Sequence, residues 1–133
     1  MVIDPAREPH DAGFDGVYRL ELTDCSQEAA RGRVEVRDDL RQAGGVVHGG
    51  VYGAIADALA VRGTAASVEP QGKVAVSLAN HTTVLYPIAD GTIHATATQR
   101  HRGRTTWVWE VEMADGDGRV CVIGRVTVAV RDG

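Results

Sequence analysis

The chain has few cysteines, no excess of basic residues and no long apolar run, and each shortage excludes a class of protein. Its two cysteines, Cys25 and Cys121, are too few for a disulfide framework and lie in no metal-binding spacing, so we expect reduced thiols. The formal charge of −4 argues against a nucleic-acid-binding face. No stretch is apolar enough to cross a bilayer, and the first residues lack the order of a signal peptide. We therefore expect a soluble protein of the cytoplasm.

Turn residues divide the 133 residues into one expected helix and six expected strands. The helix is expected over 50–68, after a Gly-rich loop and before the helix-stopping sequence at 69–72. Alternating apolar residues between turns predict the strands, at 17–22, 30–36, 73–85, 91–102, 105–114 and 119–130. Residues 1–16 are polar and are expected to form a loose arm before a single domain over 17–133.

The expected helix is apolar on nearly all its faces, so it must be covered on most sides. One curved antiparallel sheet wrapped around it meets this requirement. The result is an α+β fold, because helix and strands are segregated along the chain. Gly53 and Gly63 each weaken the helix by about 1 kcal/mol relative to Ala, and we expect both to let the sheet approach the helix axis closely.

Asp57 is the only charged residue between Gly50 and Ala60. A carboxylate within a buried helix is costly unless it is paired or used. An ion pair with Arg62 is the structural alternative, but five residues is a poor helical spacing for a pair. Asp57 is therefore the first candidate for a reactive group.

The sequence around this acid carries an ordered set of residues: Gln42, the triplet His48–Gly49–Gly50, and Asp57 nine residues after the histidine. With the later segments 78–87, 99–113 and 117–130, this set makes the chain resemble the hotdog-fold acyl-CoA thioesterases of the phenylacetate-degradation and hydroxybenzoyl-CoA type. The resemblance covers residues 14–130. It implies a hotdog fold of one central helix and about six strands, a homodimer or homotetramer, and hydrolysis of an acyl-CoA to the free acid and CoA. CoA is then part of the substrate, and neither a metal nor a cofactor is implied.

Thioester hydrolysis requires a polarised carbonyl and an activated water or nucleophile. The start of the expected helix supplies the first, because unpaired N–H groups and the helix dipole favour developing negative charge; Gly49 or Gly50 is the expected donor. The resemblance implies a second donor from the Gln42 amide. Asp57 supplies the second requirement, as general base or as nucleophile, and the sequence leaves both roles open. His48 is expected to orient these groups, or only to hold the turn.

Gly49 and Asp57 are too far apart along the expected helix to serve one substrate. Eight residues at 1.5 Å per residue separate them by about 12 Å, which a carboxylate side chain does not span. The helix start of one chain must therefore meet the acid of another. The resemblance implies the same arrangement, and we expect an obligate homo-oligomer with shared active sites.

The strand expected over 91–102 and the turn after it carry candidate contacts for an acyl-CoA. Strand alternation points His101 inward, toward the acyl group or into the core, and Arg100 and Arg102 outward. With Arg104 in the turn, these arginines are candidates to bind the CoA phosphates, or they form a charged hairpin edge. Further candidates for substrate contact are Gly50, Asn80, Thr105 and Thr106; the last three are equally ordinary strand residues. No two histidines have a metal-ligand spacing on one element.

Two positions depart from the pattern of the family. Val61 stands where some members carry Ser or Thr beside the attacking water, and Tyr86 precedes Pro87 where many carry a basic residue. Three alternatives stay open: hydrolysis of an acyl group on an acyl carrier protein, a dehydratase or hydratase of the same architecture, and a non-catalytic acyl-CoA-binding protein. The spacing of His48 and Asp57 argues against the second. The leading hypothesis is a thioesterase for aromatic or medium-chain acyl-CoA.

Overall fold

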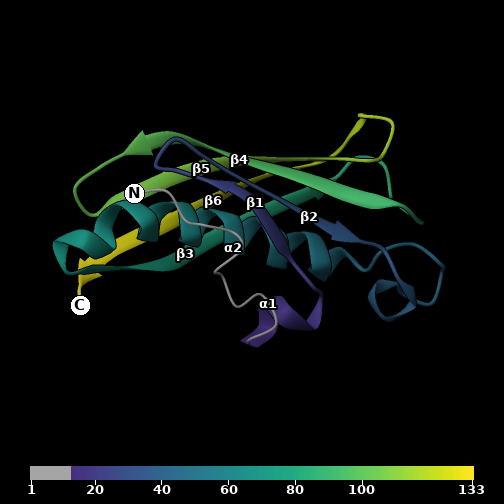
Figure 1. Ribbon diagram of the computed structural model, residues 1–133. Coiled ribbons are helices and arrows are strands. Elements are labelled where there is room, and N and C mark those ends of the chain that lie inside the picture. The colour runs from purple at the N-terminus through teal and green to yellow at the C-terminus, as the bar shows by residue number, and fades with distance from the viewer. Residues whose placement is uncertain (1–12) are drawn as a thin grey trace.

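A six-stranded antiparallel sheet folds around one long helix in the computed structural model, which describes residues 13–133 (Figure 1). The helices are α1 (Gly13–Val17) and α2 (Gly49–Val68), with short 3-10 turns η1 (Asp38–Leu40) and η2 (Glu69–Gln71). The strands are β1 (Glu21–Cys25), β2 (Ala29–Glu35), β3 (Lys73–Val84), β4 (Thr92–Arg102), β5 (Thr106–Ala114) and β6 (Val120–Asp132). Within residues 13–133, no helix is long and apolar enough to span a membrane.

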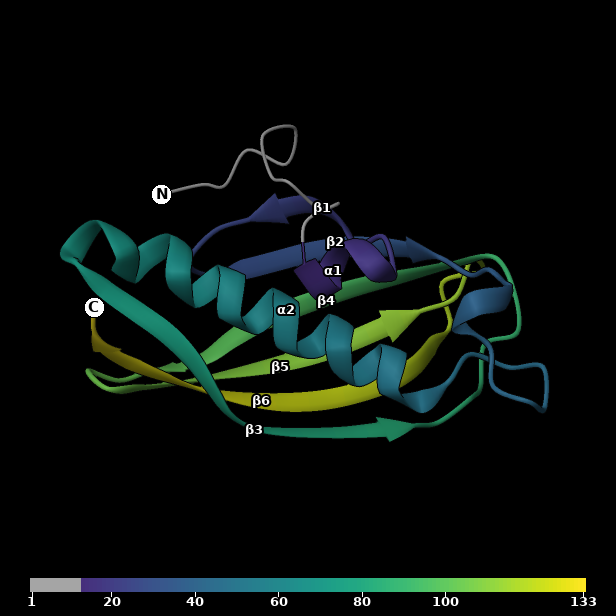
Figure 2. The same cartoon turned by 90° about the horizontal axis from the view of Figure 1, so that it is seen from below.

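The strands follow the order β1-β2-β4-β5-β6-β3, and every neighbouring pair is antiparallel. The sheet curves, and α2 lies along its concave side (Figure 2). β1 and β3 form the two edges of the sheet. This arrangement confirms the predicted α+β fold of one central helix wrapped by six strands.

Most positions of α2 are buried, as its apolar sequence predicts. Tyr52, Ile55 and Leu59 are at most 1% exposed and pack into the core with residues of the sheet. One face is more open: residues four apart along it, Gly49, Gly53, Asp57 and Val61, are exposed or half-buried. The candidate acid therefore lies on the face of α2 that the rest of the chain covers least.

The two helix glycines behave differently. A Cβ at Gly63 would lie 2.5 Å from Cη2 of Trp109, so the sheet approaches the helix closely at that point, as expected. Beside it, Trp109 Nε1 donates to Thr64 Oγ1 at 2.9 Å, and Thr64 Oγ1 donates to the Ala60 carbonyl at 2.9 Å. The expectation is wrong for Gly53, where a Cβ would meet nothing within 4 Å among residues 13–133.

The N-terminal region differs from the strand expected over 17–22. Gly13–Val17 forms the short helix α1, and β1 begins only at Glu21. Asp15 organises this segment: its carboxylate accepts a hydrogen bond from Tyr18 Oη at 2.9 Å, and its carbonyl accepts one from Leu20 N at 3.0 Å. Arg19, with φ of 57°, then turns the chain into β1. Of the arm expected over 1–16, residues 1–12 lie outside the described residues.

Candidate active site

The start of α2 is capped by His48. Its backbone is extended (φ −61°, ψ 132°), and its Nδ1 accepts a hydrogen bond from Gly50 N at 2.9 Å. An N-cap side chain of this kind satisfies one of the unpaired N–H groups of a helix start. Since Nδ1 is the acceptor, the proton of the neutral ring is on Nε2. The structure thus shows His48 holding the turn, and its contact with a substrate stays a prediction.

The cap narrows the choice of carbonyl-polarising donor. Gly50 N–H is taken by His48, whereas Gly49 N–H has no acceptor within residues 13–133. A Cβ at Gly49 would meet nothing within 4 Å among residues 13–133, so these residues leave the space beside this amide open. The Gly49 N–H is therefore the group at the helix start that is available to bind a developing oxyanion.

Gln42 belongs to the loop before the helix. Gln42 N donates to the Val46 carbonyl at 2.8 Å, and the Gln42 carbonyl accepts from Gly45 N at 3.0 Å. Gly45 has φ of +89°, a conformation that favours glycine. The Gln42 Oε1 accepts a hydrogen bond from Gly44 N, so the Nε2 hydrogens remain as donors. Its role as a second carbonyl donor stays a prediction.

Asp57 is half-buried and forms no hydrogen bond or ion pair within the described part of the chain. The alternative ion pair with Arg62 is not formed. The Arg62 guanidinium instead binds the Asp15 carboxylate, with Nη2 at 3.0 Å and Nε at 3.3 Å from Oδ2. The Asp57 charge acts on the nearby Tyr18. Burial of Tyr18 and then the charge of Asp15 are the larger causes that raise the pKa of this residue, and the Asp57 charge raises it further. The carboxylate of Asp57 is thus left available for chemistry.

Asn80 lies beside the open face of α2. Its Nδ2 donates to the Gly53 carbonyl at 2.9 Å, and its Oδ1 accepts from Thr82 Oγ1 at 2.9 Å. The side chain therefore ties β3 to α2 one helical turn before Asp57. Asn80 has ordinary structural partners, and contact with an acyl group stays a prediction.

The expected orientation of His101 is wrong because β4 contains a bulge between Gln99 and His101. Before the bulge, Gln99 pairs with the buried Trp109; after it, Arg102 pairs with the buried Trp107 and His101 with Val108. One extra residue reverses the alternation of a strand. His101 is therefore exposed on the outer face of the sheet, opposite to the face of the core.

The bulge also separates the arginines of this region. Arg100 Nε binds Glu110 Oε2 at 3.0 Å on the outer face. Arg102, expected to face outward, instead places its guanidinium carbon 4.8 Å from the Trp107 ring centroid, on the inner side. Arg100 and Arg102 therefore do not share the outer face as predicted, and phosphate binding by these two arginines and by Arg104 stays a prediction.

The turn between β4 and β5, with Arg104 and Thr105 and followed by Thr106 at the start of β5, lies at the same end of the molecule as the C-terminal end of α2 (Figures 1 and 2). The Thr105 carbonyl accepts a hydrogen bond from Val130 N at 2.9 Å, near the end of β6. Gly49 is at the other end of a helix of 20 residues, which is about 30 Å long. Within one chain, these candidates and Gly49 therefore lie at opposite ends of the molecule.

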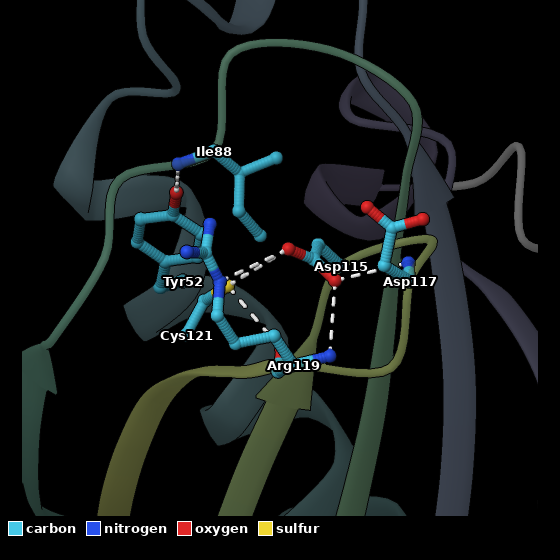
Figure 3. A network of polar contacts seen from close by, with 6 residues as sticks. All are labelled: Tyr52, Ile88, Asp115, Asp117, Arg119 and Cys121. Carbon is cyan, nitrogen blue, oxygen red and sulfur yellow. Dashed lines mark hydrogen bonds and ion pairs between the residues drawn. The ribbon is translucent and has the colours of Figure 1, made fainter.

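Three segments meet at the Gly49 end instead: the start of α2, the connection 85–91, and the β5–β6 turn at 115–119. Ile88 N donates to Tyr52 Oη at 3.2 Å (Figure 3), and the Ile88 carbonyl accepts from Val47 N at 2.8 Å. Leu85 N and Tyr86 N both donate to the Cys121 carbonyl. These bonds fix the connection 85–91 against both the helix start and β6.

Arg119 is a residue of this end that the sequence analysis missed. Its guanidinium carbon lies 4.5 Å from the centroid of the Tyr86 ring, and its Nε lies 3.3 Å from Asp115 Oδ2. The only signal in the sequence is an arginine directly after the turn Asp115–Gly118, and nothing there indicates Tyr86 as its neighbour. Among residues 13–133, no group of three or more His, Cys, Asp or Glu is placed to hold a metal ion.

Comparison with known proteins identifies the family of this chain. The model of the thioesterase superfamily matches residues 44–122, which include the His48 cap and Asp57. A 1,4-dihydroxy-2-naphthoyl-CoA hydrolase from Listeria monocytogenes is 30% identical over 119 residues, covering 90% of this chain and 96% of its own. The Mycobacterium tuberculosis protein Rv1847 is 35% identical over 115 residues, covering 85% of this chain and 82% of its own. Its solved structure superposes with a TM-score of 0.87 at 33% identity, over 90% of this chain and 97% of that chain. The chain belongs to the thioesterase superfamily, has its hotdog fold, and is a thioester hydrolase.

Proposed function

We propose that the protein hydrolyses an acyl-CoA, with Asp57 of one protomer acting on a thioester whose carbonyl is bound by Gly49 N–H of another. The observation that carries this proposal is the pairing, on one open face of α2, of an amide without an acceptor and a carboxylate without a partner among residues 13–133. An unpaired N–H at a helix start stabilises an oxyanion. An unpaired carboxylate within reach of water or of the thioester carbon acts as base or nucleophile.

Two chains are required because both groups must lie about 3 Å from the same reacting carbonyl. Gly49 and Asp57 are eight positions apart on α2, which is about 12 Å along the axis. A carboxylate on one helix does not reach the amide at the start of the same helix. A second copy, with its α2 directed the opposite way, brings its Gly49 to this Asp57 and completes two equivalent sites.

The edge strand β3 supports a second copy. β3 is an outer strand of the sheet, and the apolar side chains on and after it that are 41–57% exposed are Val74, Val76, Leu78, Val84, Leu85 and Tyr86. A long apolar edge strand is normally paired or covered. Since Asn80 ties this strand to Gly53, a copy covering β3 also lies beside the open face of α2. A dimer, alone or within a dimer of dimers, provides this cover.

The reaction follows from these groups. In the general-base path, Asp57 removes a proton from water as the oxygen attacks the thioester carbon, and Gly49 N–H binds the resulting oxyanion. The intermediate then releases the CoA sulfur, which leaves as the thiol when the proton returns to it. In the nucleophilic path, the carboxylate attacks the same carbon, CoA leaves, and water cleaves the mixed anhydride.

An aromatic acyl group is favoured by the Listeria relative, whose name gives a bicyclic aromatic CoA thioester as its substrate. His101 no longer supports this choice, because the β4 bulge turns it to the outer face. The aromatic preference therefore rests on the relative and on Gln42, which by the resemblance matches a position used by the aromatic-acyl members of the family. A medium-chain acyl group is the alternative.

The test is a panel of CoA thioesters assayed with a thiol reagent: benzoyl-, phenylacetyl-, 1,4-dihydroxy-2-naphthoyl- and medium-chain acyl-CoA. We expect CoA release by the wild type, highest kcat/KM for an aromatic substrate, and loss of turnover in Asp57→Asn with an unchanged melting temperature. Turnover only of an acyl group on a carrier protein contradicts the assignment to CoA. Tight CoA binding with no turnover of any thioester contradicts hydrolysis.

A further inference from the structure

The Gly49 end of the molecule carries one arginine that is held in a fixed orientation and faces solvent. Arg119 lies with its guanidinium carbon 4.5 Å from the Tyr86 ring centroid and its Nε 3.3 Å from Asp115 Oδ2. Asp115 is itself held, because its Oδ1 accepts hydrogen bonds from Asp117 N and Arg119 N, both at 3.0 Å (Figure 3). Stacking on an aromatic ring and a carboxylate at Nε together fix the plane of the guanidinium.

The terminal nitrogens of Arg119 have no oxygen acceptor within the described residues, although the guanidinium also interacts with the Cys121 thiol, and this contact raises the pKa of Arg119. The side chain is 57% exposed. Tyr86 is also half-exposed, at 49%. The other arginine fixed against the 85–91 connection differs: Arg41 donates through Nε to the Ala89 carbonyl and binds Asp38 through Nη1. Arg119 therefore presents to solvent a planar cation whose terminal nitrogens bind no carboxylate or carbonyl oxygen among residues 13–133.

The position of Arg119 relates it to the candidate active site. Tyr86 is in the connection whose Ile88 bonds to Tyr52 and Val47, on either side of Gly49 in the chain. The arginines that were candidates for phosphate binding, Arg100, Arg102 and Arg104, belong to the last residues of β4 and the turn after it. This turn lies at the opposite end of α2 from Gly49. A substrate whose carbonyl binds Gly49 N–H thus finds Arg119 at the same end of that chain.

We propose that Arg119, held against Tyr86 by Asp115, binds a phosphate group of the pantetheine-bearing arm of the substrate. This inference rests on the proposed function. A guanidinium binds phosphate oxygens through two parallel N–H groups, a geometry that Lys does not reproduce. Because the ring and the carboxylate already orient it, little side-chain freedom is lost on binding. The phosphate is common to CoA and to the arm of an acyl carrier protein, and the substrates below distinguish the two.

The experiment compares three thioesters of one acyl group: acyl-CoA, acyl-phosphopantetheine and acyl-pantetheine, which has no phosphate. In Arg119→Gln we expect kcat/KM for acyl-CoA to fall about tenfold through KM, as loss of a charge-assisted contact predicts, and no change for acyl-pantetheine. If kcat/KM for acyl-phosphopantetheine falls as well, Arg119 contacts the phosphate that CoA and carrier proteins have in common. If kcat/KM falls for acyl-CoA alone, Arg119 contacts the phosphates of the nucleotide part of CoA. No loss for either phosphorylated substrate, or an equal loss for all three, overturns the proposal.

Two further variants separate binding from a structural role. Arg33→Gln is the matched control, since Arg33 is also an exposed arginine bound to a carboxylate, Glu21, but on β2; we expect wild-type KM. Tyr86→Leu keeps the cation and removes its ring, so its KM for acyl-CoA should lie between wild type and Arg119→Gln. Higher salt should raise the wild-type KM for acyl-CoA and leave that of Arg119→Gln nearly constant.

Failure of the proposed function gives a different result. If the wild type hydrolyses no thioester, calorimetric titration with CoA itself still tests Arg119. Weaker CoA binding by Arg119→Gln than by wild type and Arg33→Gln supports the phosphate contact without hydrolysis. Equal binding by all three proteins overturns it.

Discussion

The indole ring of Trp109 lies so close to Gly63 that a Cβ on residue 63 would come within 2.5 Å of Cη2. Trp109 is fully buried on β5 and is held by the hydrogen bond from its Nε1 to Thr64. The ring is therefore not free to move aside. This contact fixes how closely the sheet approaches the second half of α2, and hence how α2 is seated along the sheet.

Gly63→Ala should destabilise the protein although Ala is the better helix former. The added methyl group overlaps the Trp109 ring, and overpacking of this kind costs about 1–3 kcal/mol. Gly53→Ala is the matched control, because a Cβ there meets nothing within 4 Å in residues 13–133; it should stabilise by about 0.5–1 kcal/mol. Urea unfolding of the two variants measures both values. A destabilised Gly53→Ala would show that the assembled protein fills the space beside Gly53.

His48 gives a second prediction, on the start of the helix. His48→Ala removes the acceptor for Gly50 N–H and should cost about 1 kcal/mol, whereas Asn is a good N-cap and should restore that loss. If holding the turn is the whole role of His48, His48→Asn also keeps most of kcat, because Gly49 N–H stays in place. Unfolding and kinetics are measured on the same preparations. An Asn variant as stable as wild type but as inactive as Asp57→Asn contradicts this and assigns the imidazole a contact with the substrate.

The elements that follow a regular period were predictable from the sequence. The helix starts at Gly49 and five strands lie within two residues of their expected ranges, because apolar spacing reports directly which residues a helix or strand buries. The Gly-rich loop, the His48 cap position and Asp57 were also recognised from local sequence, since each depends on neighbours in the chain.

The errors arise where one residue changes a local geometry or where contacts join distant segments. The bulge at Gln99–His101 reverses strand alternation with no glycine or proline to mark it. Arg119 and Tyr86 meet only because β6 and the connection after β3 are adjacent in the folded sheet. Alternation and spacing contain no information on either point.

The third prediction concerns acid stability. Hydrogen bonds from the backbone N–H groups of Arg119 and Asp117 lower the pKa of Asp115. A carboxyl group whose pKa is lower in the folded state contributes stability above its unfolded pKa, and this contribution is lost as pH falls through the folded value. Asp115→Asn should therefore be less stable than wild type near neutral pH, and the difference should shrink as pH falls below about 4. Melting temperatures across pH measure it, with Asp117→Asn as control; a difference that stays constant with pH contradicts the prediction.

The fourth prediction tests whether Gly49 and Asp57 of different chains form one site. Gly49→Pro removes the N–H and suits the first position of a helix, and the extended backbone of His48 is compatible with a following proline. Gly49→Ala, which keeps the N–H, is its control and should stay active. We expect Gly49→Pro and Asp57→Asn each to be inactive alone.

Co-expression of these two variants should restore activity. In a mixed dimer, Asp57 of the proline variant meets Gly49 N–H of the asparagine variant, so one of its two sites is complete. Random pairing then gives roughly a quarter of the wild-type activity. If each chain held a whole site, both variants would contribute only damaged sites, and the mixture would stay inactive. Recovery that scales with the fraction of mixed dimers therefore requires that the acid and the amide of one site come from two chains.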